Sequence, residues 1–167
     1  MSAVKQDPRI AIVEQGSQYT LKIEQSYREL GYRSVILEKK RAERWIKTHK
    51  PRLVVLSGSR SSVHEANAPQ IPNGLLELVK DGTVHTLFGI CYGQQQLMHA
   101  HGGEVVAANG NGEYGPATIE ITDPEHFLFR GLPTKQNVWT SYGDYSREAA
   151  PGFKVLAVND RGHVAAT

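Results

Sequence analysis

Cysteine is nearly absent from this sequence, since its 167 residues contain only Cys91. One cysteine cannot form a disulfide within the chain, which is typical of proteins in a reducing compartment, so we expect a cytoplasmic protein. The spacing of a metal site is absent too. His99 and His101 are two residues apart near the end of a predicted helix, and such positions do not share a helical face. We therefore expect no bound metal.

Long apolar runs and strong charge are lacking as well. No stretch is apolar for long enough to cross a membrane, and Lys5, Asp7 and Arg9 interrupt any N-terminal signal peptide. The formal net charge is +2 and the basic residues are dispersed, which argues against a nucleic-acid partner. With 40% hydrophobic residues, the chain suits one domain with a substantial core, so we expect a single domain over residues 1–167.

Short apolar segments alternate with helix-prone segments over the first hundred residues. This order predicts an α/β fold, in which an open, mostly parallel sheet is covered by helices on both faces. The predicted strands are 10–13, 35–37, 53–56 and a buried strand from Val84 to Ile90, and the predicted helices are 17–30, 42–49, 74–80 and 92–101.

The first predicted helix begins with a plausible capping residue. Ser17 is of the type that caps helix N-termini. Leu21, Ile23, Tyr27 and Leu30 recur at helical spacing, so we expect these four side chains to face the core.

The sequence pattern changes after Gly103. Residues 117–121 alternate between apolar and polar types, as a half-buried strand does. Residues 138–140 and 153–158 are two further predicted strands. We expect β-rich additions after residue 103 that edge or continue the parallel sheet.

The only cysteine lies where a predicted strand turns into a predicted helix. Gly89 and Gly93 lie two residues before and two residues after Cys91, which leaves room for a tight, strained corner. The arrangement corresponds to the G-x-S-x-G nucleophile elbow with sulfur in place of oxygen. The first N–H groups of the helix that follows favour a thiolate and can hold an oxyanion. A lone cysteine is more often an inert buried residue, and this spacing is what favours a nucleophile.

The neighbourhood of this corner follows from the predicted sheet. Loops at the carboxyl ends of parallel strands form the ligand crevice of such folds. The turns after Val13, Leu56 and Ile90 should therefore cluster, which would bring residues 57–59 beside Cys91.

Five stretches in the same order resemble the class I (triad type) glutamine amidotransferases, a flavodoxin-like family, and within it the glutaminase part of GMP synthetase. The signature G-[IV]-C-x-G-x-Q of that family is matched around Cys91, and the tyrosine after the cysteine is similar to the GMP synthetase branch. The matching stretches are GSQYT at 16–20, LSG at 56–58 with SSV at 61–63, GICYGQQ at 89–95, EYG at 113–115 and VWTSYGD at 138–144.

The resemblance implies a reaction. Cys91 would attack the side-chain amide carbon of glutamine, ammonia would leave, and water would hydrolyse the γ-glutamyl thioester to glutamate. The backbone N–H groups of Tyr92 and Ser59 would hold the oxyanion. The implied glutamine-binding residues are Gly58, Gln95, Ser141 and Tyr142. An ordinary exposed helix residue is the alternative for Gln95.

Two positions depart from the family pattern. Family members usually have Gly-Gly-Pro where this chain has Gly58, Ser59 and Arg60, and serine tolerates a positive φ poorly. Histidine is usual in the synthetase branch at the position of Tyr142.

Four other residues of the matching stretches are expected to have supporting roles. Glu113 and Tyr114 would shape the pocket wall, Trp139 would lie in the core, and Asp144 would face a partner domain rather than catalyse.

A histidine and a glutamate in a late His-Pro-Glu motif activate the cysteine in this family, and the 167 residues contain no such motif. We therefore expect a truncated or naturally shortened domain. His163 falls before the expected motif and is not assigned its role.

No P-loop-like pyrophosphatase signature is present either, so no cofactor is expected in this domain. The resemblance places ATP, magnesium and xanthosine monophosphate in a separate ATP-pyrophosphatase (synthetase) domain or subunit. The chain would supply that part with ammonia as the glutaminase part of a ligase of purine biosynthesis.

Two other interpretations stay open. The missing motif, the altered loop at residues 58–60 and Tyr142 all favour a catalytically silent relative that binds a partner or a metabolite. Another elbow-cysteine hydrolase, such as a peptidase-like relative, would have a similar architecture, and Gln95 and residues 16–20 argue against it.

Overall fold

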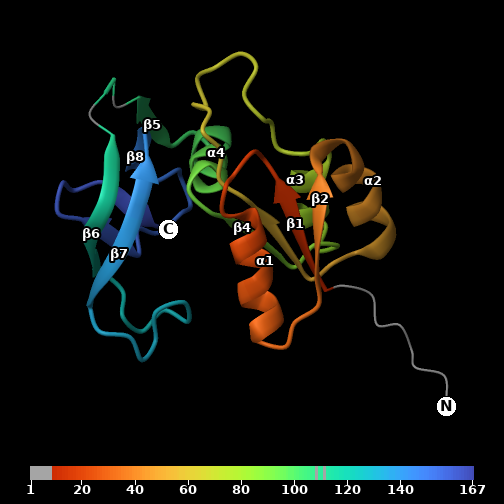
Figure 1. Ribbon diagram of the computed structural model, residues 1–167, viewed down its shortest axis with the longest axis horizontal. Coiled ribbons are helices and arrows are strands. Elements are labelled where there is room, and N and C mark those ends of the chain that lie inside the picture. The colour runs from red at the N-terminus through yellow and green to blue at the C-terminus, as the bar shows by residue number, and fades with distance from the viewer. Residues whose placement is uncertain (1–8, 108, 111) are drawn as a thin grey trace. The chain divides into compact units, whose positions relative to one another are not determined.

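The computed structural model describes residues 9–107, 109–110 and 112–167, and these form two compact units (Figure 1). The first unit consists of the described residues up to Ser61 together with Pro69–Gln94. The second consists of Ser62–Ala68 and Gln95–Thr167. That the whole chain is one domain stays a prediction.

The first unit contains a parallel four-stranded sheet. Its strands are β1 (Ile10–Glu14), β2 (Ser34–Glu38), β3 (Leu53–Leu56) and β4 (Thr86–Gly89), in the spatial order β2-β1-β3-β4. Every pairing is parallel, with Ile12 of β1 opposite Ile36 on one side and Val55 on the other. The α/β fold class predicted from the sequence is confirmed.

The continuous apolar character of the two central strands reflects burial on both faces. Ala11, Ile12 and Val13 of β1 and Val54 and Val55 of β3 are inaccessible to solvent. Strand β4, which was predicted to be buried, lies at the edge of this sheet instead.

A strand with one neighbour cannot be covered as fully as a central one. Phe88 of β4 accordingly remains 38% exposed.

Helix α1 (Thr20–Glu29) is shorter than predicted and differs from the prediction at both ends. Ile23 and Tyr27 pack against Ile10, Ile12 and Val55 as expected. Leu21 and Leu30, however, are 75% and 71% exposed. Leu30 lies beyond the helix at its C-cap.

The prediction that Ser17 caps α1 is also wrong. The N-cap is Tyr19, and no side chain caps the helix. Ser17 Oγ instead accepts a hydrogen bond from the N–H of Tyr19 at 3.1 Å, within the turn that precedes the helix. Ser17 therefore stabilises the entry to the helix rather than its first turn.

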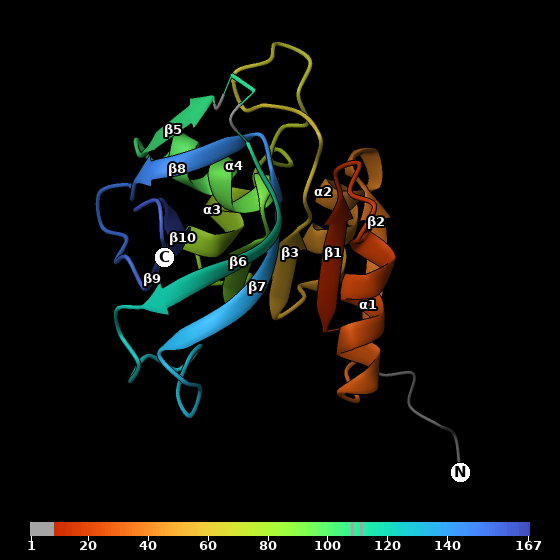
Figure 2. The same ribbon diagram turned by 60° about the vertical axis from the view of Figure 1, so that its left-hand side comes forward.

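The other helices of the first unit are α2 (Lys39–His49) and α3 (Leu75–Lys80). Ala42 and Ile46 are the buried residues of α2, and its C-cap is Lys50, which has a left-handed conformation just before Pro51. Helices α1 and α2 lie on opposite faces of the sheet (Figure 2). Within the described residues, no helix has the length and apolarity that a membrane crossing requires.

The second unit contains a six-stranded antiparallel sheet of its own. Its strands are β5 (Glu104–Ala107), β6 (Glu113–Ile121), β7 (Lys135–Tyr142), β8 (Asp144–Glu148), β9 (Ala157–Asn159) and β10 (Val164–Ala166), in the spatial order β5-β8-β10-β9-β6-β7. The β-rich region after residue 103 is confirmed.

The expectation that these strands edge or continue the parallel sheet is wrong, because they pair only with one another. Residues 153–156 also lie outside any strand, since β9 begins only at Ala157.

Helix α4 (Tyr92–Ala100) begins directly after Cys91 and continues from the first unit into the second. Its C-terminal end is closed by glycine, as predicted. Gly102 has a φ of 84°, and the N–H of Gly103 donates to the carbonyl oxygen of Met98 at 2.8 Å. Helices commonly end in this way, with a glycine in the left-handed conformation after the last turn.

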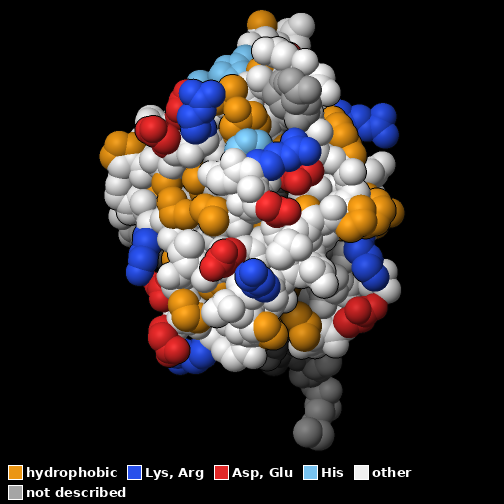
Figure 3. Space-filling model, turned by 90° about the vertical axis from the view of Figure 1, so that its left-hand side faces the viewer, with side chains coloured by type: hydrophobic (Ala, Val, Ile, Leu, Met, Phe, Trp, Pro, Cys, Tyr) orange, Lys and Arg blue, Asp and Glu red, His pale blue; other side chains and the backbone are white. Residues whose placement is uncertain are grey.

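The outer face of the β6–β7 ribbon is exposed. Tyr114 pairs with Ser141 and Pro116 pairs with Trp139 on this face, and Tyr114 and Trp139 are 71% and 70% exposed. The expectation that Trp139 lies in the core is therefore wrong. Exposed apolar side chains are ordinary on protein surfaces, and Figure 3 shows them interspersed with charged ones on the face that it presents.

Candidate active site

Three loops of the first unit meet at the carboxyl end of its sheet. The N–H of Ser57 donates to the carbonyl oxygen of Val13 at 3.2 Å, and the N–H of Ile90 donates to that of Leu56 at 3.0 Å. Ser57 Oγ accepts a further bond from the N–H of Gln15 at 3.0 Å. The predicted clustering of these three turns is confirmed.

Residue 58 brings the second of these loops next to the cysteine. A Cβ atom added at Gly58 would lie 3.6 Å from Cβ of Cys91 and 3.4 Å from Oγ of Ser17. The structure therefore brings Gly58 and Cys91 together, and the turn after β1 with them.

The corner between β4 and α4 is tight and strained. Cys91 has a φ of 54°, in the left-handed region that residues with a Cβ atom rarely adopt. A Cβ atom at Gly89 would lie 2.4 Å from the carbonyl carbon of Gly93, and one at Gly93 would lie 2.4 Å from the carbonyl oxygen of Leu56. Neither glycine can be replaced without moving backbone, so the predicted corner is confirmed together with the reason for its two glycines.

The thiol of Cys91 lies at the surface yet is not freely hydrated. The residue is exposed, whereas protein atoms around the sulfur desolvate a thiolate. This burial raises the pKa of the Cys91 thiol, and a hydrogen bond from the backbone N–H of Tyr92 lowers it by less. The N–H of Tyr92 favours the thiolate, as expected of the helix end, but desolvation outweighs it.

The altered loop of residues 57–60 is not strained. Ser59 is absent from the described residues that have a positive φ without being glycine, so serine is compatible with the conformation that the loop adopts. Ser59 Oγ accepts a hydrogen bond from the N–H of Ser61 at 3.2 Å, while Arg60 is exposed. The conformational problem expected from serine at this position does not arise.

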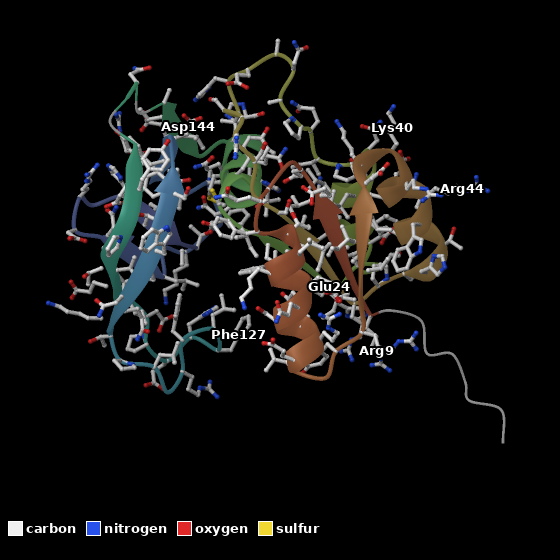
Figure 4. The ribbon with its side chains drawn as sticks, viewed as in Figure 1. Arg9, Glu24, Lys40, Arg44, Phe127 and Asp144 are labelled. Carbon is white, nitrogen blue, oxygen red and sulfur yellow. The ribbon has the colours of Figure 1, made fainter. Side chains whose placement is uncertain are left out.

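In the second unit, Gln95 is buried and holds the start of β8. It is only 6% exposed, and its Nε2 donates to the carbonyl oxygen of Asp144 at 2.6 Å. The alternative of an ordinary exposed helix residue is therefore wrong. Asp144, labelled in Figure 4, has a buried Oδ2 atom without a hydrogen-bond partner.

The other two predicted glutamine-binding residues end strand β7. Ser141 is exposed and Tyr142 is half-buried. The hydroxyl of Tyr142 donates to Oε2 of Glu113, the residue opposite it on β6. Burial and this hydrogen bond to a carboxylate both raise the pKa of Tyr142, so its hydroxyl remains protonated at any physiological pH.

Asn159 also contacts Glu113 and Tyr142, and the sequence analysis did not find it. Residues 159–162 read NDRG, which is a turn pattern with asparagine first and glycine last. That signal could have predicted a turn, but not a contact with a residue 46 positions earlier. In the described part of the chain, no group of three or more histidine, cysteine, aspartate or glutamate side chains could hold a metal ion.

The fold and the corner define a class: α/β proteins that present a cysteine at a strained turn from a parallel strand into a helix. Comparison with protein families narrows that class. The model of the family described as "Glutamine amidotransferase class-I" matches residues 11–167, and the chain belongs to this family.

Two curated relatives carry the same name. The "GMP synthase [glutamine-hydrolyzing]" of Pediococcus pentosaceus is 38% identical over 151 residues, which are 90% of this chain and 28% of the relative. The protein of the same name from Pyrobaculum aerophilum is 36% identical over 160 residues, 95% of this chain and 30% of the relative. The chain thus spans less than a third of the length of these relatives.

Solved structures agree on the fold. The protein of Thermoplasma acidophilum described as a "putative gmp synthase subunit a protein" is 26% identical with a TM-score of 0.70, over 93% of this chain and 74% of that one. A glutamine amidotransferase from Thermotoga maritima has a TM-score of 0.73 over 93% of this chain and 68% of that one, and at 20% identity it bears on the fold alone.

Proposed function

We propose that this chain is the glutaminase part of a GMP synthetase-like enzyme and that Cys91 is its nucleophile. The observation that carries the proposal is the corner at Cys91, where a φ of 54° and two glycines without room for a Cβ atom present a thiol at the start of a helix. A strained residue in a tight turn at a helix N-terminus is typical of a reactive site. Family membership supplies the substrate class.

The reaction runs through a thioester. After the Cys91 thiol loses its proton, Sγ attacks the side-chain amide carbon of glutamine and a sulfur–carbon bond forms. The carbon–nitrogen bond then breaks, and the amide nitrogen leaves as ammonia with one added proton. Water attacks the thioester carbon, which releases glutamate and restores the thiol. Glutamine and water are consumed, and glutamate and ammonia are formed.

The remaining residues bind and stabilise. The backbone N–H groups of Tyr92 and Ser59 hold the oxyanion that develops on the amide oxygen. The hydrogen bond of the Tyr92 N–H to the Cys91 sulfur supports this role, because it directs that donor toward the reacting atom. The proposed glutamine-binding residues are Gly58, Gln95, Ser141 and Tyr142.

The ammonia goes to a synthetase part, a further domain or a subunit, that lies outside these 167 residues. The curated relatives named above are more than three times as long as the matched segment, which supports such a part. There, xanthosine monophosphate is aminated with ATP and magnesium in the cytoplasm, and this chain needs no cofactor of its own.

Labelling of Cys91 by the glutamine-like electrophile acivicin tests the proposal. Mass spectrometry should find one adduct per chain, on Cys91, and excess glutamine should slow its formation. The Cys91→Ala variant should fold normally and show no adduct and no release of ammonia from glutamine. Unchanged hydrolysis in Cys91→Ala would overturn the assignment of the nucleophile.

One observation favours a second candidate, a catalytically silent family member that binds a partner or a metabolite. Burial raises the pKa of the Cys91 thiol, which disfavours the thiolate that a nucleophile needs. Absence of acivicin labelling, together with measurable binding of a synthetase part on the same preparation, would select this candidate.

A further inference from the structure

Strand β7 ends where the chain leaves one side of the antiparallel sheet for another. Strands β7 and β8 are consecutive in sequence, but β10, β9 and β6 lie between them in the spatial order. The β6–β7 pairing ends at Glu113 and Tyr142, and the β5–β8 pairing begins at Ala107 and Asp144, so the chain crosses over at Gly143 between the two ladders. Ser141 and Tyr142 are thus the last residues of β7 in its ladder with β6, and the side chains around Tyr142 add to the strand pairing there.

One carboxylate is the centre of those side-chain contacts. Oε2 of Glu113 accepts hydrogen bonds from the Tyr142 hydroxyl and from Nδ2 of Asn159, the latter at 3.0 Å. Oε1 lies 3.8 Å from Nε of Arg161, and only 14% of the Glu113 side chain is exposed. A carboxylate that is largely buried and bound to several donors is held in one conformation.

Asn159 extends the contacts to the β9–β10 turn. Its Nδ2 donates also to the Tyr142 hydroxyl at 3.0 Å. Its Oδ1 accepts bonds from the N–H groups of Arg161 at 3.1 Å and His163 at 2.8 Å. We call these five residues, Glu113, Tyr142, Asn159, Arg161 and His163, the Glu113 network.

His163 closes the network on the far side of Tyr142. Its Nδ1 lies 3.5 Å from the Tyr142 hydroxyl, and its ring stacks on that of Tyr145 with centroids 3.6 Å apart. Burial lowers the pKa of His163 more strongly than Glu113 raises it. The imidazole is therefore neutral at pH about 7, and it contributes ring packing rather than charge.

The crossover is held from its other end as well. Gln95 Nε2 binds the carbonyl oxygen of Asp144 at 2.6 Å. A Cβ atom at Gly112 would lie 2.5 Å from the carbonyl oxygen of Tyr142, so the chain before β6 packs directly on the crossover backbone. The segment is thus fixed at Tyr142, through the Glu113 network, and at Asp144.

We propose that Glu113 is a positioning residue for glutamine. Through Tyr142 and Asn159 it holds the last pair of the β6–β7 ladder, and with it the backbone of Ser141 and Tyr142, in the conformation that receives the α-amino and carboxylate groups of the substrate. This inference rests on the proposed function, because that function makes the Ser141–Tyr142 backbone a binding element. Glu113 itself does not touch the substrate. Its effect is on the free energy of binding rather than on the chemical step at Cys91.

The test separates binding from chemistry. Tyr142→Phe removes only the hydroxyl that Glu113 binds, and Glu113→Gln removes the charge. The saturation constant and the limiting rate of Cys91 modification are measured over a series of acivicin concentrations, and KM and kcat for glutamine hydrolysis are measured beside them. Both variants should show a roughly tenfold higher saturation constant and KM, corresponding to about 1.4 kcal/mol of binding free energy, with limiting rates within about twofold of the parent.

Asp123→Asn is the matched control. Asp123 lies just after β6 and forms an ion pair with Lys154 at 2.8 Å, away from the crossover. The Asp123→Asn variant should lower the free energy of unfolding slightly without changing the KM for glutamine. Rates are normalised to the folded fraction, so that a loss of stability alone leaves the saturation constant unchanged.

The outcomes separate this inference from the proposed function. Unchanged saturation constants in Tyr142→Phe and Glu113→Gln, with a reactive parent chain, would overturn the role of Glu113 alone. A fall in the limiting rate with no change in KM would also overturn it. A parent chain that neither reacts with acivicin nor hydrolyses glutamine would overturn both.

Discussion

At residue scale, Cys91 has a side chain at a position where the backbone conformation favours glycine. A left-handed conformation costs a residue with a Cβ atom about 1–2 kcal/mol, and glycine would avoid that cost. The chain nevertheless has cysteine there, at a φ of 54°. Strained residues of this kind cluster at active sites, so the strain at Cys91 agrees with the proposed role of its thiol.

The strain can be measured by replacing the cysteine. Cys91→Gly should be more stable than Cys91→Ala by about 1 kcal/mol, because alanine keeps the left-handed strain that glycine relieves. Urea unfolding followed by circular dichroism measures the difference. Ser26, which is exposed within α1, is the control position. There the alanine variant should be more stable than the glycine variant by about 1 kcal/mol, because glycine destabilises a helix relative to alanine.

The reactivity of the thiol should depend on pH in a direction that the structure fixes. Burial raises the pKa of Cys91, so its thiolate fraction at neutral pH is smaller than that of an ordinary thiol and grows as the pH rises. Iodoacetamide rates between about pH 7 and 10 should therefore show a midpoint above the value of about 8.5 for free cysteine. A midpoint below that of a cysteine peptide measured alongside would show that the N–H groups of α4 outweigh desolvation.

At element scale, the sequence was most informative where a local pattern has one structural solution. The G-x-C-x-G spacing predicted a tight corner because only glycine leaves space for backbone at Gly89 and Gly93. Continuous apolar runs predicted β1 and β3 for a similar reason, since a strand covered on both faces has no polar side.

Predictions failed where the sequence pattern does not specify which part of the fold a side chain will contact. Helical spacing placed Leu21 and Leu30 with Ile23 and Tyr27, but which of them meets the sheet depends on the rotation of α1. The contacts of Glu113 with Asn159 depend on the pairing of β6 with β9, which no local pattern encodes. The sequence therefore predicted the strained corner at Cys91 and not the Glu113 network.

The failed prediction that Trp139 lies in the core can be tested by mutation. Residues on β7 alternate between the two faces of its ribbon, and Trp139 lies on the exposed one. Trp139→Ala should therefore change the free energy of unfolding by less than about 1 kcal/mol. Leu156→Ala, at a position that is 2% exposed in the same unit, should cost about 3 kcal/mol. Equal losses of unfolding free energy in the two variants would indicate that Trp139 packs in the core.

At the scale of the whole molecule, the two units are not consecutive in sequence. The chain passes between them after Ser61, after Ala68 and after Gln94. The short insertion of residues 62–68 is held in the second unit, where Nε2 of His64 lies 3.0 Å from the carbonyl oxygen of Val105. Neither unit can therefore be cut out as one continuous segment without losing part of itself.

This connectivity predicts that the two units unfold together. Helix α4 has nine residues, and the boundary after Gln94 divides it into pieces of three and six, each too short to persist alone. Loss of either unit thus removes a helix that the other needs. Pulsed hydrogen exchange over a urea series, read by mass spectrometry on peptides from β3 and from β6, should give coincident midpoints. Separated midpoints would show two independent folding units and would overturn the prediction of a single domain.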